Sequence, residues 1–544
     1  MMFKYKNFLA KLAFLGLAVC MAPSVEAQYN ISIQIDDYKN DTLILGYRRG
    51  KQTFAKDTAF RTAPNQPFVF KSDTATLDGG VYLALLLPTN NYFEFLVTDK
   101  NRISNEQKNL KIHTKLGADG DLTRDLKINN SSDNQVFLDY LQYLNKMRNK
   151  SIEINERKEK AKTAGDAKLE ATLVAELESL NDSVSTKQKE IFSKYPDFLS
   201  SKLIKASVDP IISKEIQDKG QEAAYREYKA RYFENLDFGD HRLILTPVLE
   251  NKLEYYLDKL VIQHPDSVAV DCDLIMNKVI KGGDKEMYKY VASFLLNKYA
   301  QSQVICMDAV YVHLGQKYYC NAKNKPDWVE AEQLEKICDN VEELKHLRCG
   351  QPALEISAKN IKDGSNFKLS SLMGKKRYTL LFFWDPACGN CGKAAERLSP
   401  IYQRYKDFGL EVVGICSKDW KDVEDCRKKA TEKNMTWINL SDEAYPLAVI
   451  KKQYAIKMNP YIYLYDKDMK LMFKRLDPEQ VDDIIHRELQ AILDDPNSKE
   501  IKPEMRPALE KTLQLAKEEK AKRLEKDAAE KAKEDKAKEA NKSN

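Results

Sequence analysis

Apolar and polar positions alternate along the first part of the chain. Ile31, Ile33 and Ile35 fall on one side of an extended segment, with polar residues between them. Similar short runs, separated by Asn, Asp, Gly and Pro, lie at 42–47, 67–70, 81–87 and 92–97. Such alternation is typical of half-buried strands. It predicts an antiparallel, sandwich-like β domain over residues 28–120.

Near residue 130 the apolar spacing changes to three and four positions, which is the helical period. The Ser-Ser-Asp segment 131–133 supplies N-cap candidates, and the segment 163–166, with Gly165, is the expected turn between the first two helices. Helical spacing then continues for about 180 residues. We therefore predict an all-α central domain over 130–348.

The next region alternates continuous apolar runs with amphipathic segments, as βαβ units do. The runs 378–384 and 410–416 are typical of strands that are buried on both faces of a parallel sheet. The runs 461–465 and 471–474 flank an Asp-Lys-Asp turn and predict a hairpin. Together these runs predict an α/β domain over 349–495.

The last segment, 496–544, consists mainly of Lys, Glu and Ala. It can form a helix, but it has few large apolar residues and no sustained a/d heptads. We predict a charged helical tail that buries nothing.

Length and charge narrow the picture further. A chain of 544 residues is too long for one hydrophobic core, so the whole is multidomain. Lys and Arg number 87 against 82 Asp and Glu, a formal net charge of +5. Because the positive and negative charges nearly cancel, we expect no basic surface patch of the kind that binds nucleic acid. We therefore predict no nucleic-acid partner.

The N-terminus has the features of an export signal. Lysines precede the apolar run 12–19, and the Val-Glu-Ala segment 25–27 offers small residues for cleavage. We predict a secretory signal peptide over 1–27. The alternative is a lipoprotein anchored at Cys20, which the bulky Val19 disfavours. In both cases the mature chain folds outside the cytoplasm, in the periplasm or cell envelope. Thiols tend to be oxidised there, so a pair of free thiols in this chain indicates a specific function.

The strongest chemical signal is the Cys-Gly-Asn-Cys segment 388–391, which follows an apolar strand and opens an amphipathic helix. The free N–H groups and the dipole of a helix N-terminus favour a thiolate. We expect Cys388 to be the nucleophile that attacks a disulfide, and Cys391 to resolve the mixed disulfide. The reverse direction is equally allowed.

Other uses of this cysteine pair fit less well. A c-type haem site needs His after the second cysteine, where this chain has Gly392. A structural zinc needs a second close pair, whereas Cys416 and Cys426 are widely spaced and His346 is the only nearby histidine. A structural disulfide would close a very small loop and constrain the unfolded chain little. We expect no metal and no cofactor.

Four segments together resemble the TlpA/ResA-like exported branch of the thioredoxin superfamily. They are Gly350-Gln351-Pro352-Ala353, FFWDPACGNC, LEVVGICSKD and MNPYIYLYDKDMKLMF. The resemblance covers about residues 350–490 and implies a thioredoxin fold. It also implies that Trp384 sits beside the reactive pair, that Pro460 is cis, and that Asn459 meets a substrate strand. We therefore predict Trp384, Asn459 and Pro460 as substrate-binding residues.

The chain lacks two acidic residues that members of the superfamily often have near the cysteine pair. Ala394 stands where many members have Glu, and Phe382 where cytosolic thioredoxins have a buried acid. Proton transfer to and from Cys391 must then use water or another carboxylate, with Glu396 and Asp385 as the candidates.

The region before this domain, with Met307-Asp308-Ala309-Val310 and Trp328, resembles an uncharacterised helical domain that often precedes TlpA-like modules in Gram-negative bacteria. That resemblance implies an architecture and supplies no reaction.

Seven further cysteines follow the predicted signal peptide: Cys272, Cys306, Cys320, Cys338, Cys349, Cys416 and Cys426. An odd number leaves at least one without an intramolecular partner. We expect most of them to be small buried apolar residues, with a bridge between Cys306 and Cys320 conceivable.

These features predict an exported thiol–disulfide oxidoreductase, acting as a reductant or isomerase on protein thiols and disulfides of the cell envelope. A membrane electron donor is the second partner that this function predicts. The alternative is an envelope binding or scaffold protein whose redox module is vestigial. A peroxidase on the same fold fits worst, because FFWDPACGNC lacks the Pro/Thr/Cys loop of peroxiredoxins.

Overall fold

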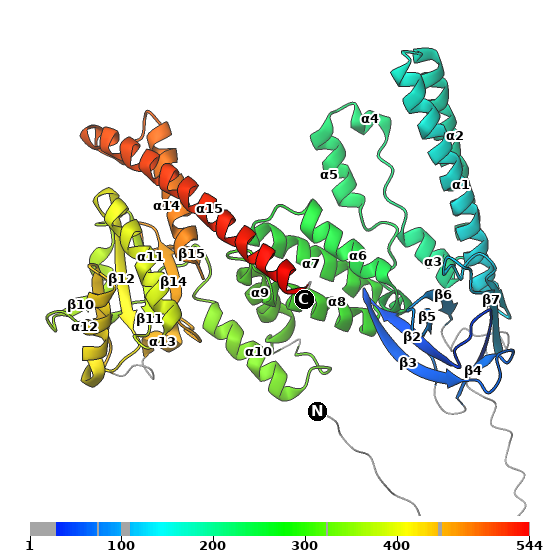
Figure 1. Ribbon diagram of the computed structural model, residues 1–544, viewed down its shortest axis with the longest axis horizontal. Coiled ribbons are helices and arrows are strands. Elements are labelled where there is room, and N and C mark those ends of the chain that lie inside the picture. Colours follow the sequence, from blue (N-terminus) through cyan, green and yellow to red (C-terminus); the bar gives the residue numbers. More distant parts are fainter. Residues whose placement is uncertain (1–28, 73–75, 99–108, 323–324, 444–448, 543–544) are drawn as a thin grey trace, which may run out of the picture. The chain divides into compact units, whose positions relative to one another are not determined.

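The computed structural model describes residues 29–72, 76–98, 109–322, 325–443 and 449–542 (Figure 1). The predicted signal peptide over 1–27 and the alternative anchor Cys20 lie outside these residues. The chain forms two compact units, one of residues up to 261 with 277–290, and one of 262–276 with 291–544. None of the described helices combines the length and the apolar character that crossing a membrane requires.

The first unit begins with two four-stranded sheets. Its strands are β1 (Tyr29–Asp36), β2 (Thr42–Arg49), β3 (Gln52–Phe60), β4 (Phe68–Ser72), β5 (Gly80–Leu86), β6 (Tyr92–Val97), β7 (Asn109–Lys115) and β8 (Lys127–Asn129). One sheet has the order β4-β1-β7-β8 and the other β3-β2-β5-β6. The predicted inward residues Ile31, Ile33 and Ile35 are buried in the core that both sheets share. The predicted antiparallel β domain is confirmed, apart from the parallel pairing of β1 with β7. Between these two strands the chain passes through the other sheet, which provides the crossover that a parallel pair needs.

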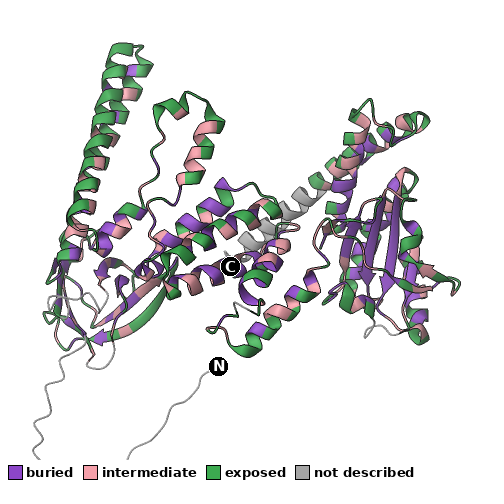
Figure 2. Ribbon diagram, turned by 180° about the vertical axis from the view of Figure 1, so that it is seen from behind, coloured by how far each residue is buried: buried purple, intermediate pink, exposed green. Residues whose placement is uncertain are grey.

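Helices follow as far as residue 344. They are α1 (Ser132–Thr163), α2 (Ala167–Lys194), α3 (Leu199–Ala206), α4 (Lys214–Gln217), α5 (Gln221–Arg231), η2 (His241–Leu245), α6 (Pro247–Tyr255), η3 (Tyr256–Leu260), α7 (Pro265–Gly282), α8 (Lys285–Ala300), α9 (Asp308–Leu314), η4 (Gly315–Tyr319) and α10 (Ala331–Leu344). Of the N-cap candidates 131–133, Ser131 is the one that caps α1: its hydroxyl accepts the Asn134 N–H and so satisfies a free donor of the helix. The predicted turn is confirmed, with Gly165 in the left-handed region at φ 71°. The α1–α2 hairpin is mostly exposed (Figure 2).

The second unit contains a seven-stranded sheet. Its strands are β9 (Ser357–Asn360), β10 (Asn366–Lys368), β11 (Tyr378–Trp384), β12 (Leu410–Cys416), β13 (Ile438–Ser441), β14 (Tyr461–Tyr465) and β15 (Leu471–Lys474). The order is β10-β9-β13-β12-β11-β14-β15, with β11 parallel to β12 and antiparallel to β14. Every residue of β11 and β12 is buried, and the sheet centre is accordingly purple in Figure 2. The two continuous apolar runs and the hairpin are therefore as predicted.

Helices accompany this sheet. They are η5 (Leu369–Leu372), α11 (Gly389–Tyr405), η6 (Lys406–Phe408), η7 (Trp420–Asp422), α12 (Val423–Glu432), α13 (Val449–Gln453), α14 (Pro478–Asp494), η8 (Pro503–Met505) and α15 (Arg506–Lys542). α11 places Ala395, Leu398 and Ile401 in one core cluster with Leu380 and Phe382 of β11. This packing holds the N-terminus of α11 beside the end of β11.

The prediction that the charged tail buries nothing is wrong for its first part. Leu509 and Leu513 of α15 are almost fully buried and belong to the core cluster of the sheet, together with Ile501. These two leucines lie four positions apart, so they form one short stripe that can pack although the segment is polar on average.

The cysteine prediction is right that one thiol is left over, but wrong that most of the seven are unbridged. The structure pairs Cys306 with Cys349, Cys320 with Cys338, and Cys416 with Cys426. Six of the seven cysteines are therefore bridged, Cys306 has a partner other than Cys320, and Cys272 is a buried free thiol. Bridging depends on the approach of two backbones in space, which spacing along the chain does not report.

Candidate active site

Cys388 occupies the N-cap of α11, directly after the short loop that leaves β11. Its Sγ accepts a hydrogen bond from the Cys391 N–H at 3.3 Å. This N–H is one of the donors that a helix start leaves without an intrahelical partner. The position at the helix N-terminus is the one predicted, and Sγ of Cys388 serves there as the acceptor that this N–H lacks within the helix.

The two thiols differ in environment. Cys388 is half-buried, whereas Cys391 is 1% exposed, and both are free. Burial raises the pKa of the Cys391 thiol to about 12, and its hydrogen bond with Cys388 and the charge of Asp385 act in the same direction. The pair therefore has one sulfur that an incoming molecule can reach and one that stays protonated behind it.

The loop before β14 faces the first sulfur. The Asn459–Pro460 bond is cis, as the family resemblance implied. The Asn459 carbonyl oxygen accepts from Sγ of Cys388 at 3.6 Å, so the structure brings the predicted residues 388, 459 and 460 together. The side-chain Oδ1 of Asn459 is enclosed and has no hydrogen-bond partner among the described residues.

Trp384 departs from its predicted role. Its side chain is 0% exposed and lies in the core cluster that also contains Cys391. A residue so enclosed cannot touch a substrate in this conformation. It ends a strand that is buried on both faces, so its indole packs inward instead of lining the surface.

Of the two candidate proton carriers, only Asp385 lies at the pair. Its carboxylate accepts hydrogen bonds from the Ala387 N–H at 2.8 Å and from the hydroxyl of Ser417. Glu396 is instead exposed and ion-paired with Lys433, which lowers the pKa of that carboxyl. Of the two candidate acids, Asp385 is therefore the one whose charge reaches the Cys391 thiol.

Ser417 was not predicted. It follows β12 directly, as Asp385 follows β11, and adjacent parallel strands bring their carboxyl ends to one edge of the sheet. The signal was therefore present in the sequence, once the two apolar runs are taken as neighbouring strands. Across the described ranges, His, Cys, Asp and Glu side chains nowhere gather in groups of three that could hold a metal ion.

Comparisons with known proteins identify the domain that carries this site. Residues 349–474 match the AhpC/TSA family, and residues 172–346 match a domain of unknown function, DUF5106. The C-terminal region is thus a thioredoxin-like AhpC/TSA domain, and the helical region before it is a separate, uncharacterised family.

Among curated proteins, the chain is similar to the thiol-disulfide oxidoreductase ResA of Bacillus thuringiensis subsp. konkukian, with 27% identity over 20% of this chain and 66% of the relative. The ResA of Bacillus anthracis is likewise 27% identical over 20% of this chain and 66% of its own length. The chain thus spans about two thirds of these relatives.

Two solved structures are also similar. A thioredoxin-like protein from Bacteroides caccae has 21% identity, a TM-score of 0.41, and coverage of 51% of this chain and 97% of its own. A conserved protein of unknown function from Bacteroides fragilis has 29% identity, a TM-score of 0.23, and coverage of 25% and 98%.

Proposed function

We propose that this protein is a thiol–disulfide oxidoreductase that exchanges disulfides with protein substrates through Cys388 and Cys391. The observation that carries the proposal is the asymmetry of the pair. Sγ of Cys388 is accessible at a helix N-terminus, while Cys391 is buried behind it with a raised pKa. Such an arrangement supplies one nucleophile and one thiol held for the second step.

In the reductive direction, the Cys388 thiolate attacks one sulfur of a substrate disulfide. The substrate S–S bond breaks, a Cys388–substrate disulfide forms, and the first substrate sulfur leaves as a thiolate that takes up a proton. Cys391 then loses its proton and attacks Sγ of Cys388, which releases the second substrate thiol. The substrate gains two electrons and two protons, and the Cys388–Cys391 disulfide carries the oxidation until an external dithiol reduces it.

The second step needs an acceptor for the Cys391 proton. We assign this role to Asp385, whose negative charge acts on the Cys391 thiol and whose carboxylate is oriented by Ala387 and Ser417. A carboxylate at this place can stand in for the acid that Ala394 lacks.

Substrate recognition begins at Asn459. An extended substrate segment that pairs with the backbone before Pro460 would bring its cysteine to Sγ of Cys388, 3.6 Å from the Asn459 carbonyl.

We place this activity outside the cytoplasm. The chain holds three disulfides besides the free pair, and disulfides of this kind persist in oxidising compartments. The predicted signal over 1–27 agrees with export. The partners are then protein thiols of the cell envelope, with a membrane-bound dithiol as the proposed electron source.

The test is a trapping experiment with the full-length chain. Cys391→Ser removes the resolving thiol, so Cys388 should accumulate mixed disulfides with envelope proteins that dithiothreitol releases. Cys388→Ser should give no adduct. If Cys391→Ser forms none although Cys388 still reacts with an alkylating agent, the pair does not exchange disulfides, and the binding or scaffold function takes its place.

A further inference from the structure

A groove of about 430 Å³ adjoins the exchange site. Pro460 lines it, and Pro460 directly follows the Asn459 whose carbonyl meets Cys388. One wall belongs to the thioredoxin-like fold, with Ile462 and Arg475. The other wall consists of Asn340 and Leu344, which lie four residues apart on the same side of α10. The helical region of unknown function therefore contributes directly to a surface beside the reactive sulfur.

The α10 wall is anchored to the loop that carries Pro460. Lys457 donates a hydrogen bond to Oδ1 of Asn340 at 3.0 Å and forms an ion pair with Glu343, also at 3.0 Å. The disulfide between Cys320 and Cys338 ties α10 to the preceding helical segment.

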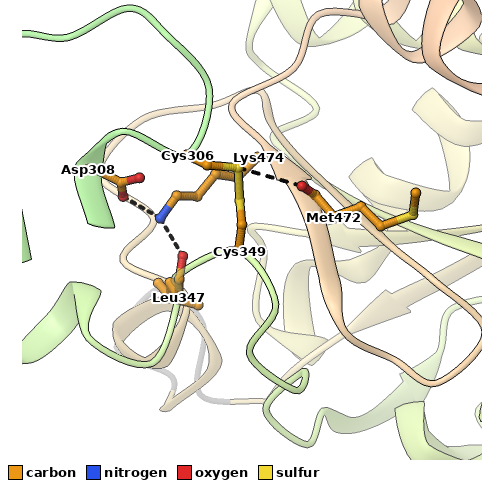
Figure 3. Close-up of a disulfide and its surroundings, with 6 residues drawn as sticks. All are labelled: Cys306, Asp308, Leu347, Cys349, Met472 and Lys474. Atoms are coloured by element: carbon orange, nitrogen blue, oxygen red, sulfur yellow. Dashed lines mark hydrogen bonds and ion pairs between the residues drawn. A yellow bond between two sulfur atoms is a disulfide. The ribbon is translucent and has the colours of Figure 1, made fainter. Parts of the chain in front are cut away.

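Next to α10, the chain is tied to β15 (Figure 3). The Cys306–Cys349 disulfide lies against this strand, where Sγ of Cys306 contacts the carbonyl of Met472. The buried ammonium of Lys474 bonds both Asp308 and the carbonyl of Leu347. These links hold the groove in one shape before a ligand arrives, which reduces the entropy lost on binding.

The groove is apolar and carries one cation, Arg475, that has no direct ion pair among the described residues. Leu344, Ile462 and Leu476 are buried apolar residues along it. Arg475 donates its Nε–H to the hydroxyl of Tyr461 at 2.7 Å. The charge of Asp308 acts on Arg475 from a distance, but no carboxylate of the described residues forms a direct ion pair with it. The positive charge of Lys457, by contrast, is already matched by Glu343.

The backbone supports a binding role. Ala455 and Arg475 both line the groove with φ values of 49° and 58°. Residues other than glycine seldom adopt this left-handed conformation, and such residues cluster at ligand sites where the surrounding structure holds them.

From these observations we infer that α10 and Arg475 select the protein substrates of the exchange site. The occupant is an extended substrate segment next to the reactive cysteine, with an apolar side chain against Leu344 and an Asp or Glu side chain against the Arg475 guanidinium. This inference rests on the exchange function proposed above and assigns a role to the helical region.

The test compares three peptides, each with a single cysteine. They differ only in one residue near that cysteine, which is Glu in the first, Gln in the second and Lys in the third. Each peptide is presented as its mixed disulfide with 2-mercaptoethanol to the reduced full-length protein. The Glu peptide should be reduced about tenfold faster than the Lys peptide, since one charge contact contributes on the order of 1.4 kcal/mol. Arg475→Gln should remove this preference.

The α10 wall is tested by Asn340→Glu, which adds a carboxylate to the groove and should lower the Glu/Lys rate ratio. Its matched control is Gln333→Glu, the same charge change at an exposed position of α10 outside the groove, which should leave the ratio as it was. If the three peptides are reduced at equal rates while hydroxyethyl disulfide is still reduced, the groove does not select substrates, and the proposed exchange function stands. If hydroxyethyl disulfide is not reduced either, the exchange function itself fails.

Discussion

Two regions of the second unit use cysteine in opposite ways. At the start of α11, Cys388 and Cys391 are free thiols, one within reach of solvent and one buried. At the junction with β15, Cys306 and Cys349 are bridged across 43 positions of the chain, with their Cα atoms 5.8 Å apart. The comparison teaches that the surroundings of a sulfur decide its chemistry. A helix N-terminus favours the reactive thiolate, whereas two backbones held together by other contacts favour a permanent bridge.

The largest expected effect concerns the reactive region. With its pKa at about 12 instead of the ordinary 9.0, Cys391 carries about 10³-fold less thiolate at neutral pH. Burial favours the neutral thiol, so its reactivity should stay low until the pH approaches 12. Iodoacetamide at pH 7 should therefore label Cys388 and spare Cys391 in the reduced folded protein, as peptide mass spectrometry would show. Unfolded protein is the control and should be labelled at both; equal labelling in the folded protein would contradict the assigned burial.

The second prediction concerns the free energy of unfolding, which should fall when the disulfide at the junction with β15 is removed. Removing the Cys306–Cys349 bridge with a double Ser variant frees a loop of 43 residues and should lower the free energy of unfolding by about 4 kcal/mol. The same change at Cys416–Cys426, which spans 10 residues, should cost about 2.7 kcal/mol. Urea unfolding without reductant gives both values. The reverse ranking would mean that local packing, and not loop length, sets the contribution of these bridges.

A third variant addresses the buried charge of the junction. Burial lowers the pKa of Lys474, and the carboxylate of Asp308 opposes that shift. Lys474→Met should lower the free energy of unfolding by about 3 kcal/mol, because it leaves Asp308 enclosed without its partner. Adding Asp308→Leu should restore most of the loss. Lys520→Met, at the exposed pair with Asp483, is the control and should change stability by less than about 1 kcal/mol.

The smallest expected effect concerns the rate of the resolving step at Cys388 and Cys391. Asp385→Asn keeps the shape of the side chain but removes the proposed proton acceptor, so the resolving step should slow by about 10²-fold. Glu396→Gln, at the exposed pair with Lys433, should leave the rate unchanged. Stopped-flow measurement of mixed-disulfide resolution distinguishes the two. Equal rates in both variants would assign the proton to water.

Much of the fold could be predicted because its signals are local. The apolar runs that became β11 and β12, the hairpin of β14 and β15, and the N-cap at Ser131 each depend on residues within one element. The position of Cys388 at a helix start could be predicted for the same reason. Trp384 shows the limit of the family resemblance. Its apolar run already predicted a strand buried on both faces, and only the resemblance gave this side chain a role in substrate binding.

The amino-acid sequence alone thus determined which segments of these elements are strands and helices, and that Cys388 would lie at the start of a helix. Only the tertiary structure decided that Cys306 bridges to Cys349, that Leu509 of a charged tail is buried, and that α10 forms a wall beside Pro460. The physical reason is that hydrophobic spacing encodes which side of an element is apolar, whereas the partner of that side is set by the packing of segments far apart in the chain.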